Sequence, residues 1–190
     1  MDELKERIIK EGIFISDDRI NVSGFINHQI DTSLMERIGE EFHFLFSDKK
    51  VDKILTVEAS GIAISSFTAR YFNHCPLVFA KKSLPNTMNE EFYSSEAKSF
   101  TKGIVNNIIV SKKYISEGEN ILIIDDFLAN GEAANALIRI IEDAKAKVSG
   151  IGIVISKNYQ KGYYNLKERG YDVKVLAPIK SITNGVIEWD

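Results

Sequence analysis

The chain has 190 residues, of which 44% are apolar and 27% are charged, a composition typical of a single globular domain with a substantial core. The formal net charge of −3 argues against nucleic acid as the main partner, and the single cysteine, Cys75, excludes an intramolecular disulfide and a cysteine-based metal site. Because the sequence has neither an apolar stretch of about 20 residues nor a secretory signal at its start, we expect a cytoplasmic protein that does not associate with membranes.

The first fifty residues contain two amphipathic patterns. Leu4, Ile8 and Ile9 recur at helical spacing within residues 1–12, and a capping sequence at residues 31–33 precedes a second apolar period over residues 34–46. Both patterns predict helices.

Short apolar runs rich in Val and Ile then recur along the chain, each followed by a helical period. They lie at residues 54–57, 77–80, 121–124 and 151–155. Such runs are typical of strands that are buried on both faces of a parallel sheet. We therefore predict an α/β fold with a mainly parallel central sheet flanked by helices.

Residues 92–110 break this rhythm. Two possible strands flank the turn-like Thr101-Lys102-Gly103, and a polar stretch precedes them at residues 83–91. This segment predicts a mobile hairpin or flap over a site.

The segment at residues 121–133 carries the clearest chemical signal. Four aliphatic residues are followed by Asp125 and Asp126, then by a short loop with Gly131, and then by a helical period whose apolar positions face the sheet. Backbone N–H groups at the start of that helix suit a phosphate. Two carboxylates beside a phosphate suit the hydroxyls of a ribose, which can donate to both. The inferred ligand is a ribose 5-phosphate.

The sequence disfavours other interpretations of this segment. An Asp-Asp pair can simply end a strand, but the attached loop and helix disfavour that reading. A receiver domain of two-component signalling also pairs its acids, but on its first strand, and too little chain follows position 126 for a receiver. The P-loop and dinucleotide-binding glycine patterns are both absent from the sequence.

The same segment resembles the PRPP-binding signature of type I phosphoribosyltransferases, where PRPP is 5-phosphoribosyl 1-diphosphate. The similarity extends over nearly all of the chain to the bacterial xanthine phosphoribosyltransferases, through residues 25–31, 58–63 and 125–133 and through Lys157 and Tyr159. It implies a single domain over residues 1–190, in which residues 1–35 contribute to a small hood over the base. It also implies a homodimer.

The resemblance assigns roles to individual residues. Asp125 and Asp126 would hold the ribose hydroxyls, and a turn with Ser60 and Gly61 would bind pyrophosphate, aided by Lys81. Family members commonly carry an Arg-Lys pair where this chain has Lys81-Lys82, so a bidentate guanidinium is replaced by point charges. The 5-phosphate would lie on the loop formed by Ala129, Asn130, Gly131, Glu132 and Ala133.

The base pocket is predicted from four residues. Lys157, at the end of a strand, can donate to the O6 atom of a 6-oxopurine, and Tyr159 can stack on the ring. The resemblance adds Ile20 and Asn27, whose amide can meet the oxygen at C2 that distinguishes xanthine.

The implied reaction is purine salvage: transfer of the phosphoribosyl group from PRPP to xanthine, with Mg²⁺ held mainly through PRPP and not by direct protein ligands. Two alternatives stay open. The base could be guanine or hypoxanthine, which Lys157 would serve equally well. The chain could instead be a PRPP-sensing transcription regulator, although such regulators add an N-terminal DNA-binding module that the first fifty residues do not resemble.

Overall fold

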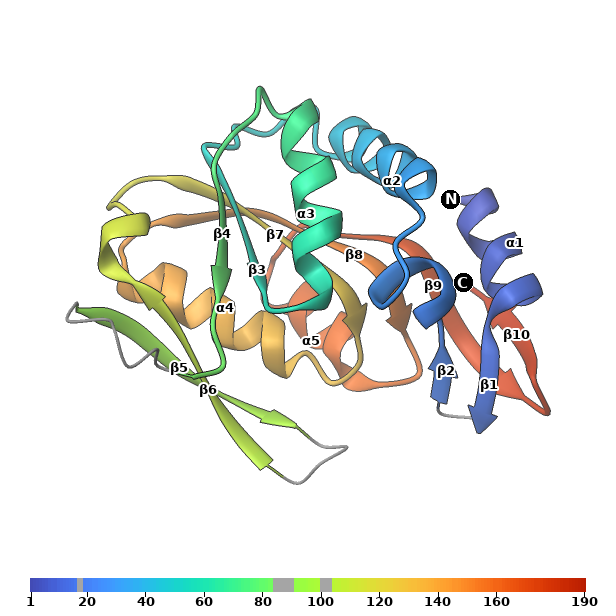
Figure 1. Ribbon diagram of the computed structural model, residues 1–190. Coiled ribbons are helices and arrows are strands. Elements are labelled where there is room, and N and C mark those ends of the chain that lie inside the picture. Colours follow the sequence, from blue (N-terminus) through green and yellow to red (C-terminus); the bar gives the residue numbers. More distant parts are fainter. Residues whose placement is uncertain (17–18, 84–90, 100–103) are drawn as a thin grey trace.

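The computed structural model describes residues 1–16, 19–83, 91–99 and 104–190 (Figure 1). None of the helices in these ranges is long and apolar enough to cross a membrane. The helices are α1 (Asp2–Glu11), the π-helical turn η1 (Ser23–Asn27), α2 (Thr32–Leu45), α3 (Ser60–Tyr71), the 3-10 turn η2 (Lys112–Tyr114), α4 (Glu132–Asp143) and α5 (Lys161–Glu168). The strands are β1 (Ile13–Ser16), β2 (Arg19–Asn21), β3 (Lys53–Val57), β4 (Leu77–Ala80), β5 (Phe92–Ser99), β6 (Ile104–Ser111), β7 (Asn120–Leu128), β8 (Lys147–Lys157), β9 (Val173–Thr183) and β10 (Val186–Trp189).

A six-stranded sheet in the order β10-β9-β8-β7-β3-β4 forms the centre of the molecule. Its five strands from β4 to β9 are mutually parallel, and β10 pairs antiparallel with β9. The predicted α/β fold and the four predicted strands are confirmed. The last two of these strands extend well beyond the apolar runs that identified them, and β9 and β10 were not predicted.

Alternate residues of β7 enter different cores, as a strand buried on both faces requires. Leu122 and Ile124 pack in the core beneath α1, α2 and α3, whereas Ile121 and Ile123 pack in the core beneath α4 and α5. Figure 1 shows these two helix groups on opposite faces of the sheet. All four side chains are fully buried.

Two glycines of β8 let helix α2 approach the sheet closely. A Cβ atom on Gly150 would lie 2.4 Å from Phe46 Cε1, and one on Gly152 would lie 2.8 Å from Phe42 Cε1. The phenyl rings of Phe42 and Phe46 therefore occupy the space that side chains on β8 would need.

The N-terminal segment, which we call the hood, packs beside the end of the chain. The β1–β2 hairpin, η1 and α1 lie beside β9 and β10, near both chain ends (Figure 1). Phe25 and Ile26 of η1 are fully buried, which fixes this turn against the α2–α3 side of the sheet.

The predicted hairpin is also confirmed: β5 and β6 pair antiparallel, with Phe92 opposite Ser111 and Ser99 opposite Ile104. Its predicted turn at residues 101–103 and most of the polar stretch before it lie outside the described residues. The hairpin is attached to α4, where the Arg139 guanidinium donates to Ser95 Oγ at 2.7 Å and to the Glu96 carbonyl at 2.6 Å.

Candidate active site

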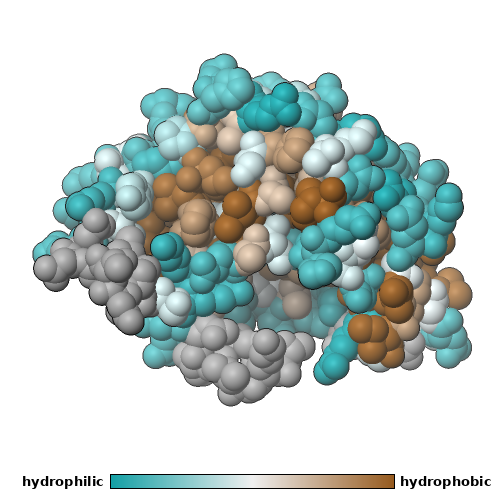
Figure 2. Space-filling view, viewed as in Figure 1, coloured by the Kyte–Doolittle hydropathy of each residue, from teal (hydrophilic) through white to brown (hydrophobic). Residues whose placement is uncertain are grey.

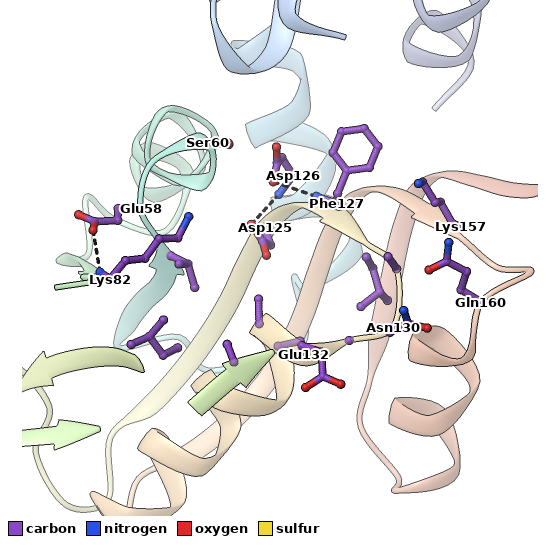
Figure 3. Close-up of a pocket in the computed structure, with 18 of the residues that line it drawn as sticks. Glu58, Ser60, Lys82, Asp125, Asp126, Phe127, Asn130, Glu132, Lys157 and Gln160 are labelled. Carbon is purple, nitrogen blue, oxygen red and sulfur yellow. Dashed lines mark hydrogen bonds between the residues drawn. The ribbon is translucent and has the colours of Figure 1, made fainter. Parts of the chain in front are cut away.

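A cleft of about 510 Å³ opens at the carboxyl ends of the parallel strands, where open α/β sheets bind their ligands (Figure 3). Strands β3, β7 and β8 and the N-terminus of α4 all contribute to its wall. Its lining residues are Arg19, Val57, Glu58, Ser60, Lys82, Ala97, Ile108, Asp125, Asp126, Phe127, Leu128, Ala129, Asn130, Gly131, Glu132, Ala133, Ala134, Lys157 and Gln160.

Two adjacent carboxylates stand at the centre of this cleft. Asp125 is 8% exposed, and its Oδ1 accepts a hydrogen bond from the Asp126 N–H at 2.9 Å. Burial, and then the negative charge of Asp126, raise the pKa of Asp125 well above its usual value, while Lys82 acts in the opposite direction. A ligand that brings hydroxyl donors or a cation to this pair would stabilise the charged carboxylates.

The loop after β7 is shaped by close backbone packing. Gly131 has a φ of 84° and caps α4, a conformation that favours glycine. A second glycine supports it from α5: the Gly162 N–H donates to the Ala129 carbonyl at 3.0 Å, and a Cβ on Gly162 would lie 2.4 Å from that oxygen. The first-turn N–H groups of α4 are thus presented to the cleft in a fixed position, suited to an anion.

The turn from β3 to α3 forms the opposite wall. Its Glu58–Ala59 peptide bond is cis, and Ser60, the first residue of α3, lines the cleft. Gly61 packs against β3, because a Cβ there would lie 1.8 Å from Thr56 Oγ1. The turn therefore brings a second helix N-terminus to the cleft, facing the one at α4.

Of the two adjacent lysines, Lys82 lines the cleft and Lys81 does not. The Lys82 N–H donates to Glu58 Oε1 at 2.7 Å, and this bond ties the segment after β4 to the β3–α3 turn (Figure 3). Lys81 exchanges two backbone hydrogen bonds of 2.9 Å with Ile109 of β6 and borders a small hollow beside Phe79.

The four residues predicted for the base differ in where they lie. Lys157 ends β8 and lines the cleft, and the Asn27 amide donates to Asp126 Oδ2 at 3.1 Å, so both are at the site. Ile20 lies in the hood, partly buried against the core. Tyr159 is 40% exposed and is not among the lining residues.

Lys157 is held by its neighbours. The Ser156 hydroxyl donates to Asn158 Oδ1 at 2.7 Å, and Asn158 Nδ2 donates to Asp190 Oδ2 at 2.6 Å. These bonds fix the residues on both sides of Lys157, so that the end of β8 is attached to the last residue of the chain.

Sequence reasoning missed four polar or aromatic residues that line the cleft, namely Arg19, Glu58, Phe127 and Gln160, and of the two adjacent lysines it selected Lys81 and not Lys82. Glu58 and Phe127 lay within segments already recognised as informative. Arg19 and Gln160 follow no local pattern, and their place in the site depends on how the hood and α5 pack.

Comparisons with known proteins agree with this geometry. A family model described as the phosphoribosyl transferase domain matches residues 29–189. A xanthine phosphoribosyltransferase of Ruminiclostridium cellulolyticum is 49% identical over 100% of this chain and 99% of its own, and one of Clostridioides difficile is 47% identical over the full length of both. In structure, an adenine phosphoribosyltransferase of Rhodothermus marinus matches with a TM-score of 0.75 at 18% identity, covering 94% of this chain and all of its own.

Proposed function

The chain belongs to the phosphoribosyltransferase family, and from this premise we propose that it transfers the 5-phosphoribosyl group of PRPP to xanthine, forming xanthosine 5′-monophosphate and pyrophosphate. One observation carries the proposal. A single cleft contains a carboxylate pair, two helix N-termini and a lysine at a strand end. Together these groups match the ribose of PRPP, its 5-phosphate and its diphosphate, and a 6-oxopurine.

The ribose phosphate would lie along the end of β7 and the start of α4. Asp125 and Asp126 would accept hydrogen bonds from the 2- and 3-hydroxyls, and the loop from Ala129 to Ala133 would surround the 5-phosphate with N–H donors. The raised pKa of Asp125 supports this placement, because hydroxyl donors would offset the cost of a buried charge beside a second carboxylate.

The pyrophosphate would lie at the start of α3. Ser60 and the backbone at Gly61 would donate to it, and Lys82, which is hydrogen-bonded to Glu58 of the same turn, would add a positive charge. The predicted role of Lys81 at the pyrophosphate remains a prediction. Its backbone is paired with β6, and the residue borders another hollow.

The base would lie between β8 and the hood. The Lys157 ammonium would donate to O6, and the Asn27 amide would donate to the oxygen at C2 once it leaves Asp126. Ile20 would contribute apolar contact from the hood, and Tyr159 would have to turn inward to stack on the ring.

The lining residues fit a Mg²⁺ ion that is bound mainly through its substrate. Carboxylate oxygens, which a hard cation prefers, are present at Asp125 and Asp126, but no cluster of three or more metal-binding side chains occurs among the described residues. When bound, the ion would neutralise the negative charge of the departing pyrophosphate.

The chain's own groups would act by positioning and by charge. As the bond from the anomeric carbon to pyrophosphate breaks, positive charge develops on the ribose, and the two carboxylates beneath it stabilise that charge. Ala97 of β5 and Ile108 of β6 line the cleft, which supports a role for the β5–β6 hairpin as a flap that excludes water.

The test is pyrophosphate release with PRPP, Mg²⁺ and each of xanthine, guanine, hypoxanthine and adenine. We expect the highest kcat/KM for xanthine, and no turnover by an Asp125→Asn, Asp126→Asn double variant. A higher kcat/KM for guanine or hypoxanthine would identify that base as the substrate in place of xanthine. PRPP binding without turnover of any base would favour a PRPP-sensing transcription regulator.

We also propose a homodimer that works in the cytoplasm. Figure 2 shows apolar side chains gathered over β4 and α3, and Phe79 of β4 is 38% exposed. Light scattering would show a mass near twice 21.4 kDa, and a Phe79→Glu variant would shift it toward the monomer. Cell fractionation tests the location.

A further inference from the structure

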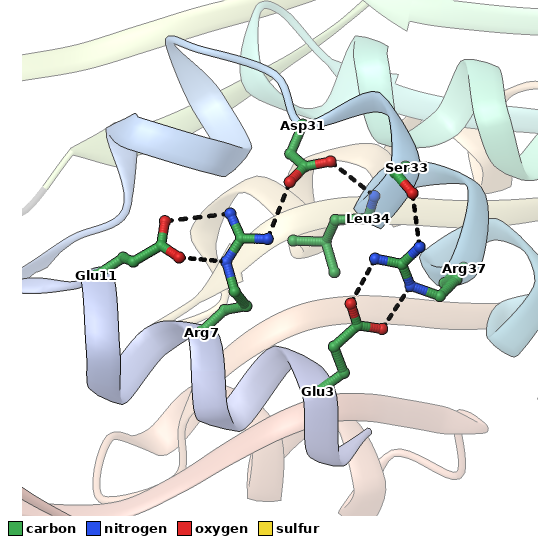
Figure 4. A network of polar contacts seen from close by, with 7 residues as sticks. All are labelled: Glu3, Arg7, Glu11, Asp31, Ser33, Leu34 and Arg37. Atoms are coloured by element: carbon green, nitrogen blue, oxygen red, sulfur yellow. Dashed lines mark hydrogen bonds and ion pairs between the residues drawn. The ribbon is translucent and has the colours of Figure 1, made fainter.

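A cluster of polar contacts joins the hood to the start of α2 (Figure 4), and none of its residues lines the cleft. It contains two arginines, and each binds a carboxylate of α1 and a residue near the N-terminus of α2. Arg7 of α1 pairs with Glu11 and with Asp31. Arg37 of α2 binds Glu3 and Ser33. The two differ in what else they contact.

Arg7 holds both ends of one short loop. Its Nη1 donates to Asp31 Oδ2 at 2.9 Å, and its guanidinium carbon lies 5.2 Å from the centre of the Phe25 ring. The Asp31 N–H in turn donates to the Phe25 carbonyl at 3.1 Å. Residues 25–31 are thus closed by a backbone bond, with the guanidinium joining the same two residues through their side chains.

This loop carries Asn27, whose amide lies beside Asp126 in the cleft. Phe25 is fully buried and belongs to the same turn, η1, so a shift of Phe25 would move Asn27 with it. A displacement of about 1 Å in a group that orients a substrate is enough to change binding substantially.

The Asp31 end of the loop is fixed as well. Asp31 Oδ1 accepts from the Leu34 N–H at 3.0 Å as the N-cap of α2, while its Oδ2 faces Arg7. The Leu34 N–H, followed by Arg7, lowers the pKa of Asp31 below its usual value, so the carboxylate stays charged near neutral pH. Glu11 orients Arg7 from the other side, with its Oε1 2.7 Å from Nε.

We infer that Arg7 is a positioning residue for base recognition, which acts by fixing the Phe25–Asp31 loop and through it the Asn27 amide. The inference rests on the proposed function, in which Asn27 contacts the base. Arg7 itself is not among the residues that line the cleft, so it would act without touching substrate. Loss of Arg7 therefore weakens binding of the base and leaves binding of PRPP unchanged.

The experiment compares Arg7→Leu with Arg37→Leu, because both remove an arginine that links α1 to α2. Steady-state kinetics give kcat and the KM values for xanthine and PRPP, and calorimetry gives the melting temperature. For Arg7→Leu we expect the KM for xanthine to rise about 10-fold, with kcat and the KM for PRPP within about 2-fold of wild type. For Arg37→Leu we expect both KM values within about 2-fold, at a similar loss of melting temperature.

Two further variants separate the contacts. Arg7→Lys keeps the charge beside Asp31 but loses the planar fork, so the KM for xanthine should recover partly. Asp31→Asn keeps the cap on Leu34 and removes only the charge that faces Arg7, so it should raise the KM in the same direction. It also serves as the test if Arg7→Leu does not fold.

Equal rises in the KM for xanthine in Arg7→Leu and Arg37→Leu would overturn the inference, as would a wild-type value in both Arg7→Leu and Asp31→Asn. A wild-type enzyme that transfers no purine base would instead refute the proposed function, so the two failures are distinguishable.

Discussion

The Asn27 side-chain amide donates a hydrogen bond to Asp126 Oδ2 at 3.1 Å, although 99 positions separate the two residues. The contact joins the hood to β7 at Asp126, which lines the cleft. Ribose hydroxyls that donate to Asp126 would compete with it and release the amide toward the base.

Replacing Asn27 with Leu tests its role with the base. We expect the KM for xanthine to rise about 10-fold, the value of one lost hydrogen bond of about 1.4 kcal/mol. Hypoxanthine has no oxygen at C2, so its KM should change by less than about 3-fold. If a steady-state assay showed equal rises in the KM for xanthine and for hypoxanthine, Asn27 would not recognise the C2 oxygen.

Lys157→Met should have a different pattern of effects. Because O6 is common to xanthine, guanine and hypoxanthine, kcat/KM should fall by about 10- to 100-fold for all three, as expected for one charge-assisted hydrogen bond. The same assay with each base provides the measurement. A loss confined to xanthine would show that Lys157 does not contact O6.

Asp125→Asn should stabilise the free protein and abolish transfer. A carboxyl whose folded pKa is raised binds more protons when folded, so its contribution to stability is lost as pH rises from about 3.9 through the folded value. The neutral amide avoids that loss and can still accept from the Asp126 N–H. We expect the melting temperature of the variant to lie about 2–5 °C above that of wild type at pH 8, and the two melting temperatures to become equal near pH 4. A lower melting temperature at pH 8 would contradict this account.

Gly162→Ala should weaken PRPP binding. The added Cβ would lie 2.4 Å from the Ala129 carbonyl oxygen and 2.7 Å from the Gly131 nitrogen, so the proposed phosphate loop must move. The KM for PRPP should rise about 10-fold, while the KM for xanthine stays within about 2-fold. Gly24→Ala is the control, because no described atom lies within 4 Å of the Cβ it would add. An unchanged KM for PRPP would show that the loop tolerates the methyl group.

Asp52→Ala should reduce the loss of stability in acid. Asp52 Oδ2 accepts from the Asn120 N–H at 2.9 Å and from Asn120 Nδ2 at 2.6 Å, and with Lys50 these bonds lower its pKa to about 2. A lowered pKa stabilises the fold above the unfolded value of about 3.9, and this contribution is lost as pH falls toward 2. Thermal melts between pH 5 and pH 2 should show a shallower decline for the variant. A decline as steep as that of wild type would rule out this role.

Local patterns were enough to predict the ribose phosphate half of the cleft. The aliphatic run of β7, the paired acids, Gly131 and the amphipathic α4 follow one another directly, so each constrains the next. Strand β9 was missed because Lys174, Pro178 and Lys180 interrupt its apolar residues, and this strand is only partly buried. Its place in the sheet depends on β8.

Contacts between distant segments could not be read in this way. Lys81 and Lys82 are adjacent in sequence, but only Lys82 lines the cleft. This difference follows from the backbone pairing of Lys81 with Ile109. The contact from Asn27 to Asp126 likewise depends on how η1 packs against the core.

The strand order of the central sheet also bears on how the chain folds. Strands β7, β8 and β9 are neighbours both in sequence and in the sheet, so residues 120–183 can form through short loop closures. The pairing of Ile54 with Leu122, by contrast, must enclose α3, β4 and the β5–β6 hairpin. We expect the C-terminal half to gain structure first and β3 to join it later. Asp125, Asp126, the loop at Gly131 and Lys157 belong to the half that we expect to fold first. Ser60, Lys82 and Asn27 belong to the other half, so the cleft would be complete only when the two halves join.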